Sequence, residues 1–157
     1  MTTHPNKMIS FKDICINDYE KSKHLLSLLT NNNEDFSFNL FSQMCLSLNP
    51  NHRIICCFYY DIEAELDIMI GMGTILIEHK LIHNCGCVGH IEDVVIDQKY
   101  RNMNIGKLLI ETLVDIATNK RAYKVILNCI SDNAEFYKKC GFYESNKEMR
   151  MNIMNII

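Results

Sequence analysis

A nearly uninterrupted apolar stretch at residues 89–97 constrains the fold more than any other part of the chain. It is broken mainly by Glu92 and Asp93, and it predicts a central strand that is buried on both faces. Two carboxylates in such a strand need a reason, which can be structural or functional. From Ile105 to Ala117 apolar residues recur at helical spacing, and residues 124–129 again have the composition of a strand. The pattern predicts a strand–helix–strand unit within an α/β domain.

The rest of the chain predicts further strands and helices around this unit. Asp18 can cap a helix whose leucines at 25, 26, 28 and 29 face the core, and Gly141 ends the last helix. The other expected elements are strands at residues 9–14, 54–60, 68–78 and 149–153, with the middle two forming a hairpin, and helices at residues 36–48 and 133–140. We expect a single domain over residues 1–157.

Composition and charge narrow the classes of function. The 157 residues are 48% hydrophobic, which is enough for one buried core. A formal charge of -3 without a block of like charges offers no electrostatic footprint for nucleic acid or an anionic membrane. No apolar run is long enough to span a bilayer, and the first residues do not resemble a signal peptide, so we expect a soluble, cytoplasmic protein. The eight cysteines are expected to be reduced.

The connection at residues 100–106 joins the predicted central strand to a helix. Free backbone N–H groups and the positive end of the helix dipole meet at such a point and can bind a phosphate. Asn102 and Asn104 tolerate left-handed backbone angles and can shape a loop of consecutive amides. The loop lacks the residues of a P-loop or a dinucleotide fingerprint. By itself it is more often an ordinary strand-to-helix turn.

Three segments together resemble the GNAT superfamily of N-acetyltransferases: GHIEDVVID at 89–97, YRNMNIGKLLI at 100–110 and NAEFYKKCGF at 133–142. The segment IEHKLIHNC at 77–85 and the pair Tyr123-Lys124 are similar to eukaryotic glucosamine-6-phosphate N-acetyltransferases in particular. The resemblance implies a mixed, mostly antiparallel twisted sheet that is splayed at its central strand and flanked by helices. It also implies acetyl-CoA-dependent conversion of D-glucosamine 6-phosphate to N-acetyl-D-glucosamine 6-phosphate, a step of UDP-GlcNAc biosynthesis.

In that family acetyl-CoA lies in the split of the sheet. Its pantetheine arm pairs with the central strand as an added strand would, and its pyrophosphate lies on the loop that begins the following helix. Where the family often has glycine, this chain has Asn104, which implies a looser fit. The implied acetyl-CoA contacts are Val94, Val95, Ile96, Asn102, Met103, Asn104, Ile105, Gly106, Lys107, Asn133, Ala134, Glu135 and Tyr137.

The reaction needs a neutral amine, a polarised thioester carbonyl and a stabilised thiolate. A backbone N–H at Val94 or Val95 would contact the oxyanion. The resemblance assigns the contact with the CoA sulfur to Tyr137, which shares a helical face with Asn133. Where the family has an acid, this chain has Asn128, which cannot accept a proton. The base is therefore left open between Glu92, a backbone carbonyl and an ordered water.

For the sugar phosphate, lysines attract the phosphate, while carboxylates accept hydrogen bonds from the hydroxyls and the amine. Glu92 and Asp93 face opposite sides of a regular strand unless a bulge turns one of them. The family's phosphate-binding arginine, given across a homodimer by the last strand, falls on Asn152, and we expect Arg150 to replace it. The implied substrate contacts are Thr30, Lys80, Leu81, Ile82, His83, Glu92, Asp93, Lys124, Arg150 and Asn152.

Three other interpretations compete with this one. His79, His83, Cys85 and Cys87 have the side chains of zinc ligands, but their spacing matches no standard site, and we expect no metal. A GNAT enzyme can instead acetylate a protein N-terminus, a lysine or a polyamine. The chain can also be an acyl-CoA-binding regulator without turnover, which the absence of an acid at position 128 would favour.

Overall fold

The computed structural model describes residues 9–29 and 36–153. The described residues up to Leu127 form one compact unit, and those from Asn128 onward form a second, smaller one. The expected single domain over residues 1–157 stays a prediction.

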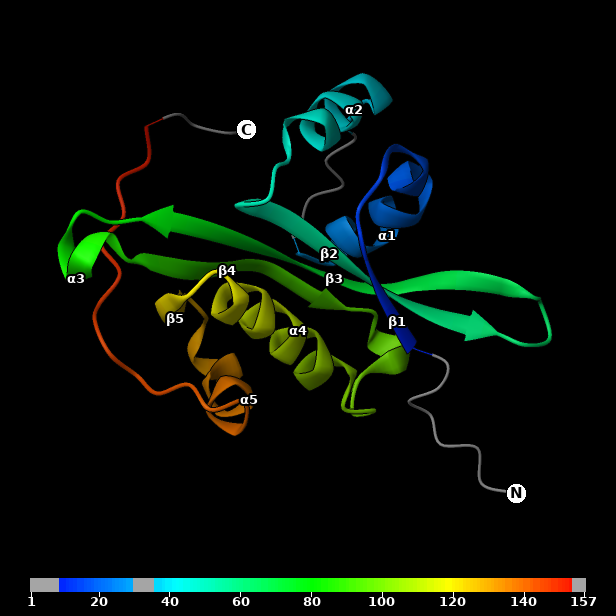
Figure 1. The fold of residues 1–157 in the computed structure, drawn as a ribbon. Helices are drawn as coiled ribbons and strands as arrows, with labels where there is room; N and C mark the ends of the chain where they lie inside the picture. The colour runs from blue at the N-terminus through cyan, green and yellow to red at the C-terminus, as the bar shows by residue number, and fades with distance from the viewer. Residues whose placement is uncertain (1–8, 30–35, 154–157) are drawn as a thin grey trace. The chain divides into compact units, whose positions relative to one another are not determined.

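Among the described residues of the first unit, five strands form one open sheet in the order β1-β2-β3-β4-β5 (Figure 1). The first three pairings are antiparallel, and β5 pairs with β4 in parallel. The sheet is therefore mixed and mostly antiparallel, as the resemblance implies, and the predicted hairpin joins β2 to β3. The strands are β1 (Ile9–Asp13), β2 (His52–Asp61), β3 (Leu66–His79), β4 (Cys87–Ile96) and β5 (Ala122–Leu127).

Helices cover both faces of this sheet. In the first unit α1 and α2 lie on one side of it, and α4 lies on the other (Figure 1). The helices are α1 (Tyr19–Leu29), α2 (Phe38–Ser47), the short α3 (Ile82–Cys85), α4 (Ile105–Asn119) and, in the second unit, α5 (Ala134–Lys139). Short 3-10 turns lie at Ile16–Asp18, Gln98–Tyr100 and Ser131–Asn133.

The predicted amphipathic helix after the central strand is α4. Its apolar stripe is buried through Ile105, Leu109, Ile110, Leu113 and Ala117, which pack on the sheet. On the opposite face Leu25 of α1 and Phe41 of α2 pack against Met72 and Val95 of the sheet. Burying a leucine or phenylalanine side chain contributes about 1.5–3 kcal/mol, so these two layers hold the helices on the sheet.

Asp18 caps the N-terminal helix in a different way from the simple N-cap that we expected. The helix α1 begins at Tyr19, after a 3-10 turn over Ile16–Asp18. The carboxylate of Asp18 accepts a hydrogen bond of 3.0 Å from the backbone N–H of Cys15, three residues earlier. Asp18 thus satisfies the amide that precedes the turn, as the third residue of a capping box does.

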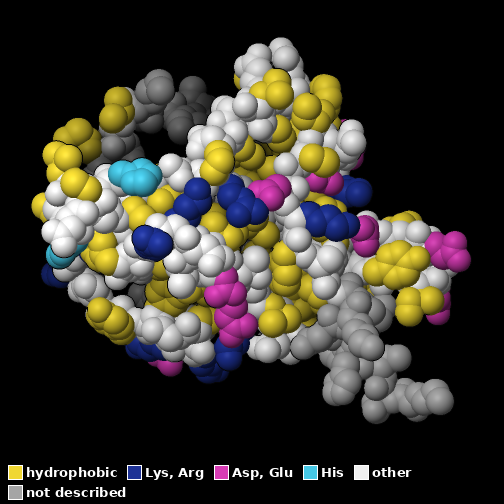
Figure 2. Space-filling model, in the orientation of Figure 1, with side chains coloured by type: hydrophobic (Ala, Val, Ile, Leu, Met, Phe, Trp, Pro, Cys, Tyr) yellow, Lys and Arg dark blue, Asp and Glu magenta, His cyan; other side chains and the backbone are white. Residues whose placement is uncertain are grey.

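The surface of α2 is unusually apolar. Phe38, Leu40, Met44 and Leu46 are all exposed, and Figure 2 shows hydrophobic side chains exposed over this helix.

None of the helices in the described ranges combines the length and the apolar character that a bilayer crossing requires.

Three sequence predictions need correction. Residues 149–153 form no strand in the described part of the chain, and Met149, Met151 and Ile153 are exposed. A strand needs a partner for its backbone hydrogen bonds, and the described residues of the second unit form no strand that could serve as one. The strand expected at 124–129 ends at Leu127. The central strand is not buried on both faces throughout, because its carboxylates at 92 and 93 are exposed.

Candidate active site

The sheet opens between β4 and β5. The ladder between these strands ends at the pair Ile91 and Leu127, yet β4 continues to Ile96. Over residues 92–96, β4 pairs with β3 on one side and with no described strand on the other. This splay is the geometry that the sequence resemblance implies, and it leaves a strand edge to which an extended polar chain can be added.

A β-bulge interrupts β4 beside this opening. Met72 pairs with Val95 and Thr74 pairs with Glu92, so Gly73 alone faces the two residues between them. One of the two is Asp93, whose φ is +52°, a left-handed angle that is uncommon outside glycine. The other is Val94, whose side chain points toward α4. A Cβ added at Gly73 would contact Val94 together with Leu109 and Leu113 of α4.

The bulge brings both carboxylates to one face of the sheet. Glu92 lies directly opposite Thr74, and residues opposite each other in an antiparallel pair share a face. Asp93 and Thr74 line the same pocket of about 270 Å³, whose walls are otherwise mostly the apolar side chains of α1, α2 and the sheet. The sequence left open whether a bulge exists, and the structure supplies it.

The same face carries a row of polar groups from β3 to β5. Glu78 pairs with Val88, which in turn pairs with Lys124 of β5, so the side chains of these three residues share this face. His90 lies on the same face of β4, two residues after Val88. We call Thr74, Glu78, His90, Glu92, Asp93 and Lys124 the polar face.

Glu78 is the centre of a small charge cluster on the polar face. Its Oε1 lies 2.5 Å from Nζ of Lys80, and its Oε2 lies 2.8 Å from Nε2 of His90. The hydrogen bonds from Lys80 and then from His90 lower the pKa of Glu78 below its ordinary value. Sequence reasoning missed Glu78 and His90, because twelve positions separate them and only the strand register brings them together.

The loop between β3 and β4 is held in an unusual conformation. His83, Asn84 and Cys85 all have left-handed φ angles, from +53° to +56°. The N–H of Lys80 donates to the carbonyl of Gly86 at 2.8 Å, which closes the loop, and the rings of His83 and Tyr123 lie 4.4 Å apart. Leu81 and Ile82, two further predicted contacts, are exposed at the start of the loop.

The predicted phosphate loop has the backbone that the sequence indicates. Asn102 and Asn104 both have a φ of +64°, and Asn104 is the N-cap of α4. Its side chain makes no capping hydrogen bond. The first N–H groups of a helix have no partner inside the helix, so the amides of Ile105, Gly106 and Lys107 are suited to bind an anion.

Several predicted site residues lie in the second unit. Asn133 ends a 3-10 turn, and α5 follows with Tyr137, whose ring packs against Phe136 and Phe142 at centroid distances of 5.0 and 6.1 Å. Ala134 and Glu135 form the first turn of α5. The guanidinium of Arg150 donates to Oδ1 of Asn152 at 3.0 Å, and Asn128 is exposed. Thr30 lies outside the described residues.

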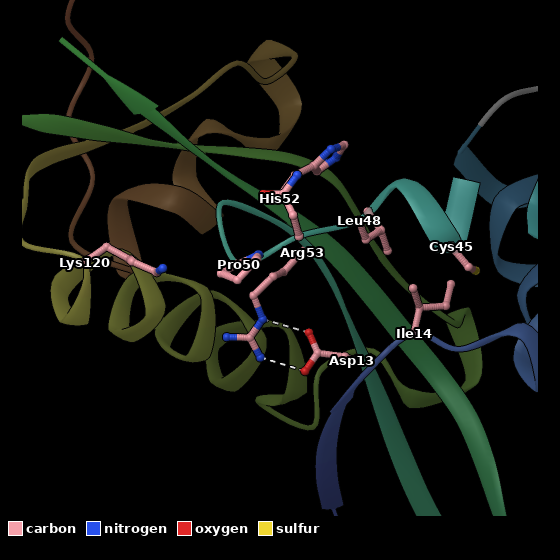
Figure 3. Close-up of a pocket in the computed structure, with 9 residues that line it drawn as sticks. Asp13, Ile14, Cys45, Leu48, Pro50, His52, Arg53 and Lys120 are labelled. Carbon is pink, nitrogen blue, oxygen red and sulfur yellow. Dashed lines mark hydrogen bonds and ion pairs between the residues drawn. The ribbon is translucent and has the colours of Figure 1, made fainter. Parts of the chain in front are cut away.

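A second, larger pocket of about 410 Å³ lies beside the start of β2 and adjoins the first, with which it shares Ile14 and Cys45. Figure 3 shows its basic side chains, of which Arg53 forms a two-pronged ion pair with Asp13 at 2.7 and 2.8 Å. Arg53 lowers the pKa of Asp13, mainly through these hydrogen bonds. The residues that line it include none of the predicted site residues.

The candidate zinc ligands have other contacts. His79 lies 3.3 Å from the side-chain amide of Asn51, His83 stacks on Tyr123, and the thiol of Cys87 donates to the carbonyl of Lys120. Within residues 9–29 and 36–153, no three His, Cys, Asp or Glu side chains are grouped as a metal site requires.

Comparisons with known proteins agree with this geometry. Residues 19–142 match the model of the acetyltransferase (GNAT) family. The chain is 34% identical over 145 residues to glucosamine 6-phosphate N-acetyltransferase 1 of Dictyostelium discoideum, covering 90% of this chain and 88% of that one. It is 35% identical over 137 residues to the Arabidopsis thaliana glucosamine 6-phosphate N-acetyltransferase, with coverages of 84% and 88%.

Solved structures show the same relationship. The crystal structure of the Arabidopsis thaliana glucosamine-6-phosphate N-acetyltransferase superposes with a TM-score of 0.76 at 30% identity, and the match covers 93% of this chain and 99% of that one. The chain therefore belongs to the GNAT family of acetyltransferases, in the group of the glucosamine 6-phosphate N-acetyltransferases.

Proposed function

We propose that the protein transfers the acetyl group of acetyl-CoA to the amine of D-glucosamine 6-phosphate. The observation that carries this proposal is the order of groups beside the opening of the sheet. Lys124 lies at one end of the polar face, where Lys80 is bound to Glu78, and the neighbouring carboxylates Glu92 and Asp93 lie at the other end. A sugar with a phosphate at one end and an amine at the other matches that order of charges.

The acetyl-CoA contacts proposed here follow the unpaired edge of β4. The backbone of residues 94–96 would pair with the pantetheine arm, and the amides that begin α4 would bind the pyrophosphate. The left-handed angles of Asn102 and Asn104 support this assignment, since they turn consecutive amides toward one point. Asn104 keeps that angle although it has a side chain where glycine is usual in the family.

In the proposed reaction the neutral amine attacks the thioester carbonyl, a C–N bond forms, and the C–S bond breaks to release CoA. Glu92 and Asp93 orient the amine and accept its hydrogen bonds, and Glu92 takes up the proton that the amine loses. A backbone N–H at Val94 or Val95 stabilises the oxyanion. We assign the protonation of the leaving thiolate to the phenol of Tyr137 and only an orienting role to Asn128.

The remaining assignments belong to the same proposal. Asn133 to Glu135 would help to hold the cofactor, while Arg150, Asn152 and Thr30 would contact the sugar phosphate. We propose a single-domain, cytoplasmic homodimer in which the C-terminal segment completes the partner's site, as part of UDP-GlcNAc biosynthesis. The exposed apolar residues of 149–153 support a role for that segment at an interface.

A thiol-release assay over a panel of acceptors tests the proposal. Acetyl-CoA is supplied with glucosamine 6-phosphate, unphosphorylated glucosamine, a peptide with a free N-terminus, or spermidine. We expect glucosamine 6-phosphate to give the highest kcat/KM. If a peptide or a polyamine gives the higher kcat/KM, the acceptor is not glucosamine 6-phosphate. If the protein binds CoA but releases no thiol with any acceptor, it is an acyl-CoA-binding regulator without turnover.

A further inference from the structure

The carboxylate of Glu78 binds one basic side chain with each of its two oxygens. Oε1 is 2.5 Å from Nζ of Lys80, and Oε2 is 2.8 Å from Nε2 of His90. Glu78 and His90 are on adjacent strands, while Lys80 follows the end of β3. The carboxylate is therefore held from two directions, and it ties the start of the β3–β4 loop to β4.

We infer that Glu78 is a positioning residue that acts through Lys80, holding the Lys80 ammonium where the phosphate of the sugar substrate binds. The inference rests on the proposed function. A lysine side chain has four rotatable bonds and loses much conformational freedom when it is fixed on a ligand. A lysine that Glu78 already holds in place loses less of that freedom on binding.

Lys80 can bind Glu78 and a phosphate at the same time. An ammonium group has three N–H donors, so one bond to Glu78 leaves two for phosphate oxygens. A phosphate monoester carries about −1.5 to −2 charges near neutral pH and so needs more than one cation. Lys124 lies in the same row of the polar face, across Val88 from Glu78, and supplies a second positive charge.

The hydrogen bond from His90 fixes the position of the Glu78 carboxylate. An ionised carboxylate only accepts hydrogen bonds, so Nε2 of His90 must carry a proton to donate to it. The direction of the Glu78 pKa shift agrees with an ionised carboxylate that accepts bonds from both neighbours. His90 therefore anchors Glu78 to β4, and Glu78 in turn anchors Lys80.

The test compares Glu78→Gln and Glu78→Ala with the unmodified protein. We expect the KM for glucosamine 6-phosphate to rise about tenfold in the alanine variant and less in the glutamine variant, with kcat and the KM for acetyl-CoA unchanged. With unphosphorylated glucosamine, kcat/KM should stay within about twofold, because the lost contact concerns the phosphate alone. A merely structural role would lower the rate with both acceptors. Glu63→Gln, in the exposed β2–β3 turn, is the matched control.

A double-mutant cycle shows whether Glu78 acts through Lys80. Glu78→Ala in a Lys80→Met background should add no further rise in KM. Additive effects, or an unchanged or lower KM in Glu78→Ala, would overturn this inference while the proposed function stands. No acetylation of glucosamine 6-phosphate by the unmodified protein would overturn both.

Discussion

The bulge in β4 predicts that glycine is more stable than alanine at position 93 but less stable than alanine at position 92. Asp93 has a φ of +52°, whereas the neighbouring strand residue Glu92 has no positive φ. A left-handed angle costs a residue with a Cβ about 1–2 kcal/mol, and glycine avoids that cost. Glycine itself costs about 0.5–1 kcal/mol relative to alanine through its freedom in the unfolded chain.

These terms give the expected difference. At position 93 the relief of strain is set against the entropic cost, so Asp93→Gly should be more stable than Asp93→Ala by about 0–1.5 kcal/mol, with about 0.75 kcal/mol at the centre of that range. At position 92 only the entropic cost applies, so Glu92→Gly should be less stable than Glu92→Ala by about 0.5–1 kcal/mol. Each pair removes the same carboxylate, so the lost charge cancels within the pair.

Urea unfolding followed by circular dichroism measures all four variants. A difference of about 1 kcal/mol moves the melting temperature by about 2–4 °C in a chain of this size, so thermal melts provide a second readout. If Asp93→Gly proves less stable than Asp93→Ala, as at position 92, then residue 93 is not in a bulge. The argument that both carboxylates share one face would then be wrong.

Three further predictions concern the loop, an ion pair and the leaving group. Gly86→Ala should destabilise the protein and raise the KM for the sugar phosphate, because a Cβ there would lie 3.1 Å from the ring of Tyr123; urea unfolding with unchanged stability would contradict this. Arg53 lowers the pKa of Asp13, so this pair stabilises the fold above the ordinary pKa of an aspartate and loses that effect as the pH falls through the lowered value. Unfolding free energies at pH 7 and pH 3 should therefore differ less in Arg53→Met than in the unmodified protein, and an equal difference would refute the linkage. Tyr137→Phe should lower kcat more than it raises KM in steady-state assays, because its proposed contact forms as the thiolate develops; a change in KM alone would exclude that role.

Local patterns in the sequence predict much of the fold. The helical stripe of α4 and the β2–β3 hairpin depend on periodicity within one segment, and both are confirmed. The left-handed angles of Asn102 and Asn104 also follow from residue type, since asparagine is among the few residues that adopt them readily.

Features that depend on pairing between distant segments were not predictable in the same way. The bulge at Asp93 follows from the register of β4 against β3, and an exposed aspartate gives no signal for it. The contacts of Glu78 with His90 depend on the same register. The strand expected at 149–153 failed for a related reason, because alternating apolar residues make a strand only where a neighbour accepts their hydrogen bonds.

A crystal structure of the protein with CoA and glucosamine 6-phosphate tests the central claim most directly. We predict that the sugar lies on the polar face, with its phosphate at Lys80 and Lys124, its amine at Glu92 and Asp93, and the pantetheine arm along residues 94–96 of β4. A sugar phosphate bound instead at the pocket of Asp13 and Arg53, or a CoA that does not pair with β4, would contradict the account.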